Sequence, residues 1–338
     1  MAFDVGWLFL AFGGGVIGAA LGGLPIFILC GVAAIVGAAV NMVSGSSVFT
    51  NMVAFGPILG PQISFAGGAA AAVYAANRKK LGSGRDIATA LMGLDSPDVL
   101  LVGGAFGVLG YLLWWAFAQL PNIGTTGFTN PIALSIVVNA IIARLMFGKT
   151  GVFGKVRKGD NRWLCSDCAG WLPWQSKPLQ LLVLGLGAGL VVAWSTLQAP
   201  ALVTLWFGVA VVGLLFLQFS TKVPVWHHIA LSVEQVIVVG GADLGWGMAF
   251  GVLSAYLGEI YAGLFTAHGD SHIDPPSASL FTTFTIMAIL KALGAFSITG
   301  AGSLIIAAVV AVAGYAVMMA LKARPNMDRT VTSTPATA

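Results

Sequence analysis

One carboxylate, Glu234, interrupts the apolar stretch "HHIALSVEQVIVVGG", with Gln235 beside it. An ionisable side chain inside a membrane segment is costly and usually faces a cavity or a partner. Glu234 could therefore bind and release a proton or a cation, which makes it the candidate coupling group of a transport site. Two other interpretations stay open: a buried structural hydrogen bond, and exposure on an interfacial loop.

Polar side chains also bracket two segments that we interpret as half-helices, the first of which is too short to span a membrane. Asp86, Asp95 and Asp98 surround "GRDIATALMGLDSP", and His227, His228 and Asp243 bracket "PVWHHIALSVEQVIVVGGAD". The N-terminus of a half-helix offers unpaired amides and the positive end of its dipole. We therefore predict that half-helices near 86–98 and 228–243 meet at a shared site. An N-cap role is the alternative for Asp98 and Asp243.

The segment from Ser44 to Ala76 has an unusual composition for a lipid-facing helix. Two Gly-Pro pairs, at 56–57 and 60–61, stop helix propagation, and Asn51 and Gln62 add polar groups. Non-helical backbone at membrane depth is tolerated where it is buried in protein or lines a cavity. The composition favours a broken, cavity-lining element, and an external loop is the alternative.

Two short motifs carry residue types that bind metals. "AHGDSHID" places His268 and His272 four residues apart between aspartates, which suits zinc, although a solvated polar turn is the commoner explanation. "RWLCSDCAGW" gives Cys165 and Cys168 the spacing of half a zinc site. Because the chain has three cysteines in all, a Cys₄ centre would need a neighbouring subunit, and reduced structural thiols are the favoured interpretation.

The elements that must position these residues are membrane helices. Hydrophobic residues make up 58% of the 338 residues and charged residues 8%, far below the quarter that a soluble surface needs. A bilayer of about 30 Å is crossed by around 20 apolar residues. We predict spans near 7–22, 25–42, 61–76, 98–119, 130–148, 178–197, 201–220, 243–264, 276–294 and 302–321.

Lysine and arginine collect in two loops, 77–85 and 149–177, which the positive-inside rule assigns to the cytoplasm of a cell inner (plasma) membrane. This bias accounts for the net charge of +4, so no nucleic-acid partner is predicted. Lys322 and the basic residues after it also favour the inside, yet counting ten spans forward puts them outside. One predicted span is therefore wrong, or a segment taken as re-entrant crosses the membrane.

The pentapeptide AFGVL occurs twice, at 105–109 and 249–253, an offset of 144 residues. Pro131 and Pro275 repeat the same offset, and "DIATAL" from Asp86 lies opposite "HIALSV" from His228 at an offset of 142. These matches predict an internal duplication, a common plan of membrane transporters. A re-entrant 226–241 segment makes the halves parallel, which we favour, and a crossing segment makes them inverted.

The sequence thus predicts an all-α polytopic bundle of about ten spans with two internal repeats and re-entrant or broken helices. The predicted units are a first repeat with an extra N-terminal span (1–148), a basic CxxC loop (149–177), a second repeat with an extra C-terminal span (178–321) and a polar tail (322–338). No G-x-S-x-G, Walker or H-E-x-x-H motif is present, so no enzyme is predicted.

The expected function is that of a homo-oligomeric permease that moves a small solute or ion, driven by a gradient, through a site between the repeats. The alternatives are an oligomeric ion channel and a non-transporting scaffold with a zinc-binding CxxC loop.

Overall fold

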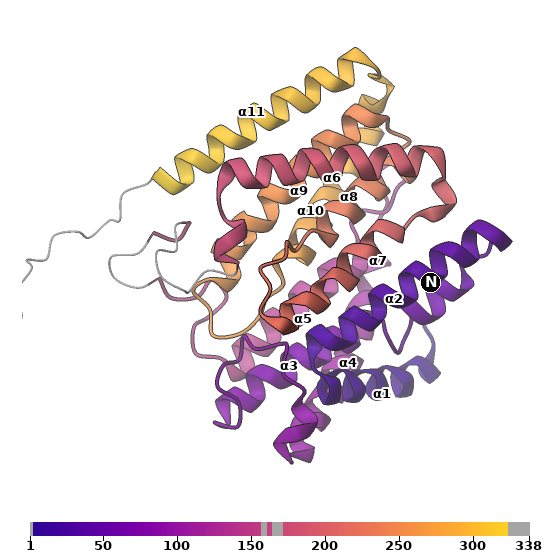
Figure 1. Ribbon diagram of the computed structural model, residues 1–338. Helices are drawn as coiled ribbons and strands as arrows, with labels where there is room; N and C mark the ends of the chain where they lie inside the picture. The colour runs from indigo at the N-terminus through magenta and orange to yellow at the C-terminus, as the bar shows by residue number, and fades with distance from the viewer. Residues whose placement is uncertain (1–2, 157–160, 164–171, 324–338) are drawn as a thin grey trace, which may run out of the picture.

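The computed structural model describes residues 3–156, 161–163 and 172–323 (Figure 1). These residues form eleven α-helices with short 3₁₀ and π turns, and they contain no β-strand. Six helical stretches in this part of the chain are long and apolar enough to cross a membrane. The predicted all-α class is confirmed, whereas the ten spans remain a prediction.

Five helices lie before the basic CxxC loop and six lie after it. The first five are α1 (Val5–Leu21), α2 (Gly23–Ser44), α3 (Ser64–Asn77), α4 (Pro97–Phe117) and α5 (Pro131–Phe147). The others are α6 (Pro178–Gln198), α7 (Leu205–Val212), α8 (His227–Val238), α9 (Leu244–Tyr261), α10 (Pro275–Ala292) and α11 (Ala301–Ala323). Proline occupies the first position of α4, α5, α6 and α10, where its missing N–H costs nothing.

Glycine brings the two AFGVL helices close to a neighbour. A Cβ on Gly15 of α1 would lie 2.2 Å from the carbonyl oxygen of Gly103 on α4, and a Cβ on Gly251 of α9 would lie 2.4 Å from that of Gly185 on α6. Such backbone contact is the packing that small residues allow between membrane helices. The α1–α4 and α6–α9 pairs therefore pack by the same means.

The chain directions follow from loops that meet on one face of the molecule. Lys80, just after α3, donates to Ser96 Oγ at 2.5 Å, so α4 begins on this face. Gly84 pairs with Ser271, between α9 and α10, so α9 ends and α10 begins here. Asn77 donates to the carbonyl of Phe147, so α5 also ends here. We call this the basic face; α4 and α9 run in opposite directions relative to it, and so do α5 and α10.

Two helices begin in the interior, after interrupted backbone. The chain leaves α2, forms a π turn at Thr50–Ala54 and several tight turns, and enters α3 only at Ser64. This is the broken element that the two Gly-Pro pairs predict, and its Phe55 and Pro61 line a cavity. In the second half, non-helical residues 220–226 precede α8.

The predicted half-helix over 86–98 is wrong. This segment holds bends and a single 3₁₀ turn, Leu91–Leu94. The Asp86 carboxylate accepts hydrogen bonds from the amides of Ala88 and Thr89, which closes a tight turn, and Asp95 has a φ of 48°, in the left-handed region. Both features divert the backbone from a helix.

Candidate functional site

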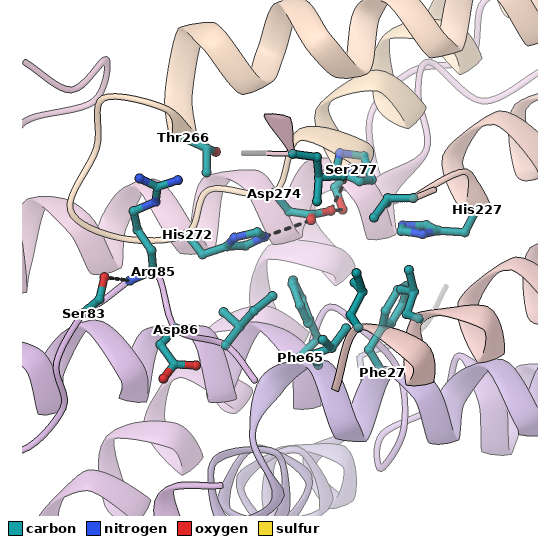
Figure 2. A pocket seen from close by; sticks show the side chains of 17 residues that line it. Phe27, Phe65, Ser83, Arg85, Asp86, His227, Thr266, His272, Asp274 and Ser277 are labelled. Atoms are coloured by element: carbon teal, nitrogen blue, oxygen red, sulfur yellow. Dashed lines mark hydrogen bonds and ion pairs between the residues drawn. The ribbon is translucent and has the colours of Figure 1, made fainter. Parts of the chain in front are cut away.

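Cavity A lies inside the basic face and has a volume of about 440 Å³ (Figure 2). Its lining comes from both halves of the chain: Phe27 of α2, Phe65 of α3, Arg85 and Asp86 of the α3–α4 connection, His227 of α8, and His272 and Asp274 of the α9–α10 connection. Figure 2 shows the polar groups of the α9–α10 connection opposite the two phenylalanines. A solute bound here would meet hydrogen-bonding groups on one side and aromatic rings on the other.

Cavity B has a volume of about 250 Å³ and lies toward the opposite face. Its lining is largely apolar and includes Phe55, Asn130 at the start of α5, Thr204 before α7, and Gln235 of α8. Three residues, Phe27, His227 and Ser277, line both cavities. We call these three the dividing layer, since they are what the two cavities share.

His227 is the first residue of α8 and is 4% exposed. Its ring packs edge-on against Phe27, with centroids 5.1 Å apart, and against Phe207 at 6.0 Å. Its Nδ1 has no hydrogen-bond partner among the described residues, and no side chain caps the start of α8. A buried polar atom without a hydrogen bond costs free energy unless something binds it. The N-terminal end of α8 is therefore a place where a ligand or a proton would gain a partner.

Asp274 caps the start of α10 beside this histidine. Its Oδ2 accepts hydrogen bonds from the amide and hydroxyl of Ser277 at 2.8 and 2.6 Å, and its Oδ1 lies 3.1 Å from His272 Nε2. Burial alone would raise the pKa of this carboxyl, but the hydrogen bonds and the nearby imidazoles of His272 and His227 outweigh burial and lower it. Asp274 is therefore a fixed negative charge at the edge of cavity A.

Arg144, which the sequence interpretation missed, positions this connection. Its guanidinium is fully buried and donates to the carbonyl oxygens of Phe265 and Ser271 at 2.5 Å and of Val152 at 3.0 Å. It also donates to Ser271 Oγ at 2.7 Å. The only available signal was a lone cation within the predicted span 130–148.

Glu234 lies outside both cavity linings. It is fully buried, and its Oε1 accepts a hydrogen bond from the Trp206 amide at 2.8 Å. Trp206 stands in the first turn of α7, so the carboxylate faces the positive end of that helix. This is a structural hydrogen bond, one of the interpretations left open for Glu234, while its neighbour Gln235 lines cavity B.

The other predicted aspartates divide between structural contacts and cavity A. Asp86 lines cavity A, and Asp95 is exposed. Asp98 accepts from the Tyr74 hydroxyl at 3.0 Å, and the N-cap of α4 is Ser96, so an N-cap role for Asp98 is wrong. Asp243 does cap α9, as the alternative interpretation has it.

The remaining polar candidates, His228, Gln62 and Asn51, line neither cavity, although the His228 ring packs edge-on against that of His227 with centroids 5.7 Å apart. His228 is buried against Gly258 of α9, with no partner for either ring nitrogen among the described residues. Gln62 is fully buried and donates to the carbonyl of Phe55 at 3.0 Å. Asn51 is exposed and donates to Ser47 Oγ.

The predicted metal ligands do not assemble within the described part of the chain, where no group of three His, Cys, Asp or Glu side chains has a metal-binding arrangement. His268 contacts the carbonyl of Arg162 at 3.2 Å, whereas His272 pairs with Asp274. Cys165 and Cys168 lie outside the described residues.

Comparison with known proteins finds one family model. It is described as "Family of unknown function (DUF7973)", and it matches residues 1–164 and again residues 164–305. No curated protein and no solved structure matches the chain.

Proposed function

The chain belongs to this family of unknown function, and we propose that the protein is a gradient-driven membrane permease in which a small solute or ion passes between cavity A and cavity B. The observation that carries the proposal is the pair of cavities on either side of one dividing layer. Alternating access needs a site that can open to each side in turn, and these cavities give each side its own approach to His227.

An internal repeat, which we propose from the packing of the helices, would support this function. In the first half, α1 packs on α3 and α4, and α3 also packs on α4 and α5. The second half has the same pattern: α6 packs on α8 and α9, and α8 also packs on α9 and α10. The family model also matches the chain in two consecutive segments that meet at residue 164. We therefore assign α1–α5 to one repeat and α6–α10 to the other.

The directions of the helices favour inverted over parallel repeats. Two pairs of helices that we take as equivalent, α4 with α9 and α5 with α10, run in opposite directions relative to the basic face. The parallel arrangement favoured from the sequence assumed that the segment containing α8 does not cross. In the inverted arrangement, the extended residues 220–226 and α8 together make one crossing.

The packing pattern also changes which segments correspond. It pairs α8 with α3, not with the 86–98 segment that the letters DIATAL suggested. Phe65 in the first turn of α3 and His227 at the start of α8 both line cavity A. Inverted-repeat transporters commonly place the starts of broken helices at the substrate, and this pair fits that plan.

Five crossings in each repeat and α11 give eleven crossings, with the two ends of the chain on opposite sides. The basic loops 77–85 and 149–177 and the end of α11 then lie on the same, cytoplasmic side. Lys322 of α11 contacts Glu259 Oε1 near the end of α9 at 2.8 Å, on the basic face. This count removes the conflict between the C-terminal basic residues and the ten-span prediction.

A third cavity of about 340 Å³ extends the route on the basic face. Lys79 and Lys149 line it, and it shares Ser83 and Arg85 with cavity A. On the other side, the rings of the dividing layer separate cavity A from cavity B. A transporter explains this interrupted route better than an ion channel, which needs a continuous pore.

Counterflow in proteoliposomes tests the proposal. Purified protein is reconstituted with an unlabelled extract of small metabolites inside, and an isotope-labelled extract of the same metabolites is added outside. We expect mass spectrometry to show saturable entry of one chemical class of solute, and protein-free liposomes serve as the control. Large unitary currents in planar bilayers would instead support a channel, and neither flux nor current would contradict both.

A further inference from the structure

Among the described residues, His227 is the one ionisable side chain that lines both cavities. The other two members of the dividing layer, Phe27 and Ser277, do not titrate near neutral pH. A group that carries a coupled proton must be reached from each side of the membrane in turn. Only His227 meets this condition.

We propose that the driving gradient is one of protons and that the His227 imidazole carries the coupled proton between cavity B and cavity A. This inference rests on the proposed transport function. A proton entering from one cavity binds the lone pair of the neutral ring, which becomes an imidazolium with two N–H groups. The same proton leaves to the other cavity, which restores the neutral ring, and no other bond changes.

The unpartnered Nδ1 supports this role together with the cavity linings. Buried polar atoms without a partner are uncommon, and His228 and Glu234 also carry them, but of these three residues only His227 lines both cavities. Here Nδ1 meets no donor or acceptor in the described part of the chain, and aromatic rings pack around the imidazole. The ring is therefore held in place while one nitrogen stays available for a proton.

The charges around His227 set the conditions for binding. Burial of the ring opposes the imidazolium, and the Asp274 carboxylate, held in place by its hydrogen bonds to Ser277, favours it. The other titratable or charged groups that line cavity A or adjoin His227 are His272 beside Asp274, Arg85 and Asp86 on the α3–α4 connection, and His228 on α8. Arg85 and His227 line the same cavity, so an anionic solute bound there would favour protonation of the ring and link the two events.

Glu234 does not meet the same condition. Its carboxylate lies outside both linings and is engaged by the start of α7. The segment that engages this carboxylate includes Thr204 and Phe207, which line cavity B but not cavity A, so Glu234 has no approach from cavity A. The inference therefore moves the coupling role from Glu234 to His227.

The test compares exchange with accumulation in proteoliposomes for wild type, His227→Gln and His227→Asn. His268→Gln is the matched control, because it makes the same change at another buried histidine that lines neither cavity. Counterflow of the isotope-labelled metabolite extract needs no net proton movement, whereas uphill accumulation does. For one proton per neutral solute, one pH unit drives an about tenfold accumulation.

We expect wild type and His268→Gln to accumulate solute with the imposed pH gradient. The His227 variants also alter the lining of both cavities, and we expect them to lose accumulation in a greater proportion than counterflow. Absence of counterflow in wild type would overturn the transport proposal itself. Counterflow without any pH-driven accumulation in wild type, or accumulation that persists in both His227 variants, would overturn the proton assignment alone.

If both His227 variants fail to fold, wild type decides the question. A pH-sensitive dye inside the liposomes reports whether protons enter with solute in the absence of an imposed gradient. Solute entry that acidifies the interior supports proton coupling, and solute entry at constant internal pH refutes it.

Discussion

The glycine contact between α1 and α4 allows a sharp test of the packing, because α1 carries its own control. A Cβ on Gly15 would meet three backbone atoms of α4, at 2.2, 2.9 and 3.0 Å, and backbone cannot rotate away. A Cβ on Gly13, two residues earlier, would meet nothing within 4 Å. Gly15→Ala and Gly13→Ala therefore add the same methyl group to the same helix in opposite surroundings.

The size of the effect follows from how far α1 must retreat. Carbon contacts are best near 3.5–4.0 Å, so a Cβ at 2.2 Å forces a shift of about 1 Å, which loses about a quarter to a half of each dispersion contact along the helix pair. We expect Gly15→Ala to cost about 1–3 kcal/mol. Gly13→Ala should stabilise by about 0.5–1 kcal/mol through helix propensity.

The assay is unfolding of the detergent-purified protein, followed by tryptophan fluorescence during titration with a denaturing detergent. The second half of the chain supplies an independent copy of the experiment on α6, with a Cβ on Gly185 at 2.8 Å from Val252 Cα and a Cβ on Gly187 meeting nothing within 4 Å. Equal midpoints for Gly15→Ala and Gly13→Ala, or a more stable Gly15→Ala, would refute the close packing of α1 on α4.

Further predictions concern single side chains. Glu234→Leu leaves the Trp206 amide without its acceptor and should lower stability by about 1–3 kcal/mol in thermal unfolding; a loss of pH-driven accumulation with unchanged stability would contradict its structural role. Arg144→Met leaves buried carbonyls without a donor and should cost at least about 1–3 kcal/mol, with Arg144→Lys intermediate; wild-type stability in Arg144→Met would contradict the positioning role. Since the pKa of Asp274 is lowered, its contribution to stability is present above the usual value of about 4 and is lost as pH falls below it; thermal unfolding of wild type should therefore approach that of Asp274→Asn in acid, and a constant difference would refute this. In a variant lacking the native cysteines, Leu217→Cys in cavity A and Val203→Cys in cavity B should react with an impermeant thiol reagent from opposite sides of the membrane; reaction of both from one side would contradict the dividing layer.

The elements with the strongest local signals are the ones predictable from the sequence. The AFGVL helices α4 and α9 follow from their long apolar runs, and the break before α3 follows from its two Gly-Pro pairs. The prediction of a half-helix over 86–98 is wrong because it relied on the similarity of these letters to those of α8. In the structure the Asp86 carboxylate closes a turn instead. Similar letters do not show whether an aspartate carboxylate accepts hydrogen bonds within a turn or lies beside a helix.

The candidate site was only partly predictable. Glu234 stands out in an apolar run, but its partner, the start of α7, lies 28 residues away in the chain. His227 gained its importance from Phe27, two hundred residues earlier. Contacts of this kind depend on the tertiary fold. They cannot be predicted from the residue spacing or the composition of a single sequence.

The odd number of crossings in each proposed repeat has a consequence for the origin of the protein. When a five-crossing unit is duplicated in tandem, the second copy inserts with the opposite orientation. A single-unit ancestor of such a protein would have inserted in both orientations and formed a dimer of oppositely oriented copies. Nineteen residues, including a basic cluster, now join α3 to α4, and five join α8 to α9. This difference in loop charge is what would have locked each half into one orientation after the fusion.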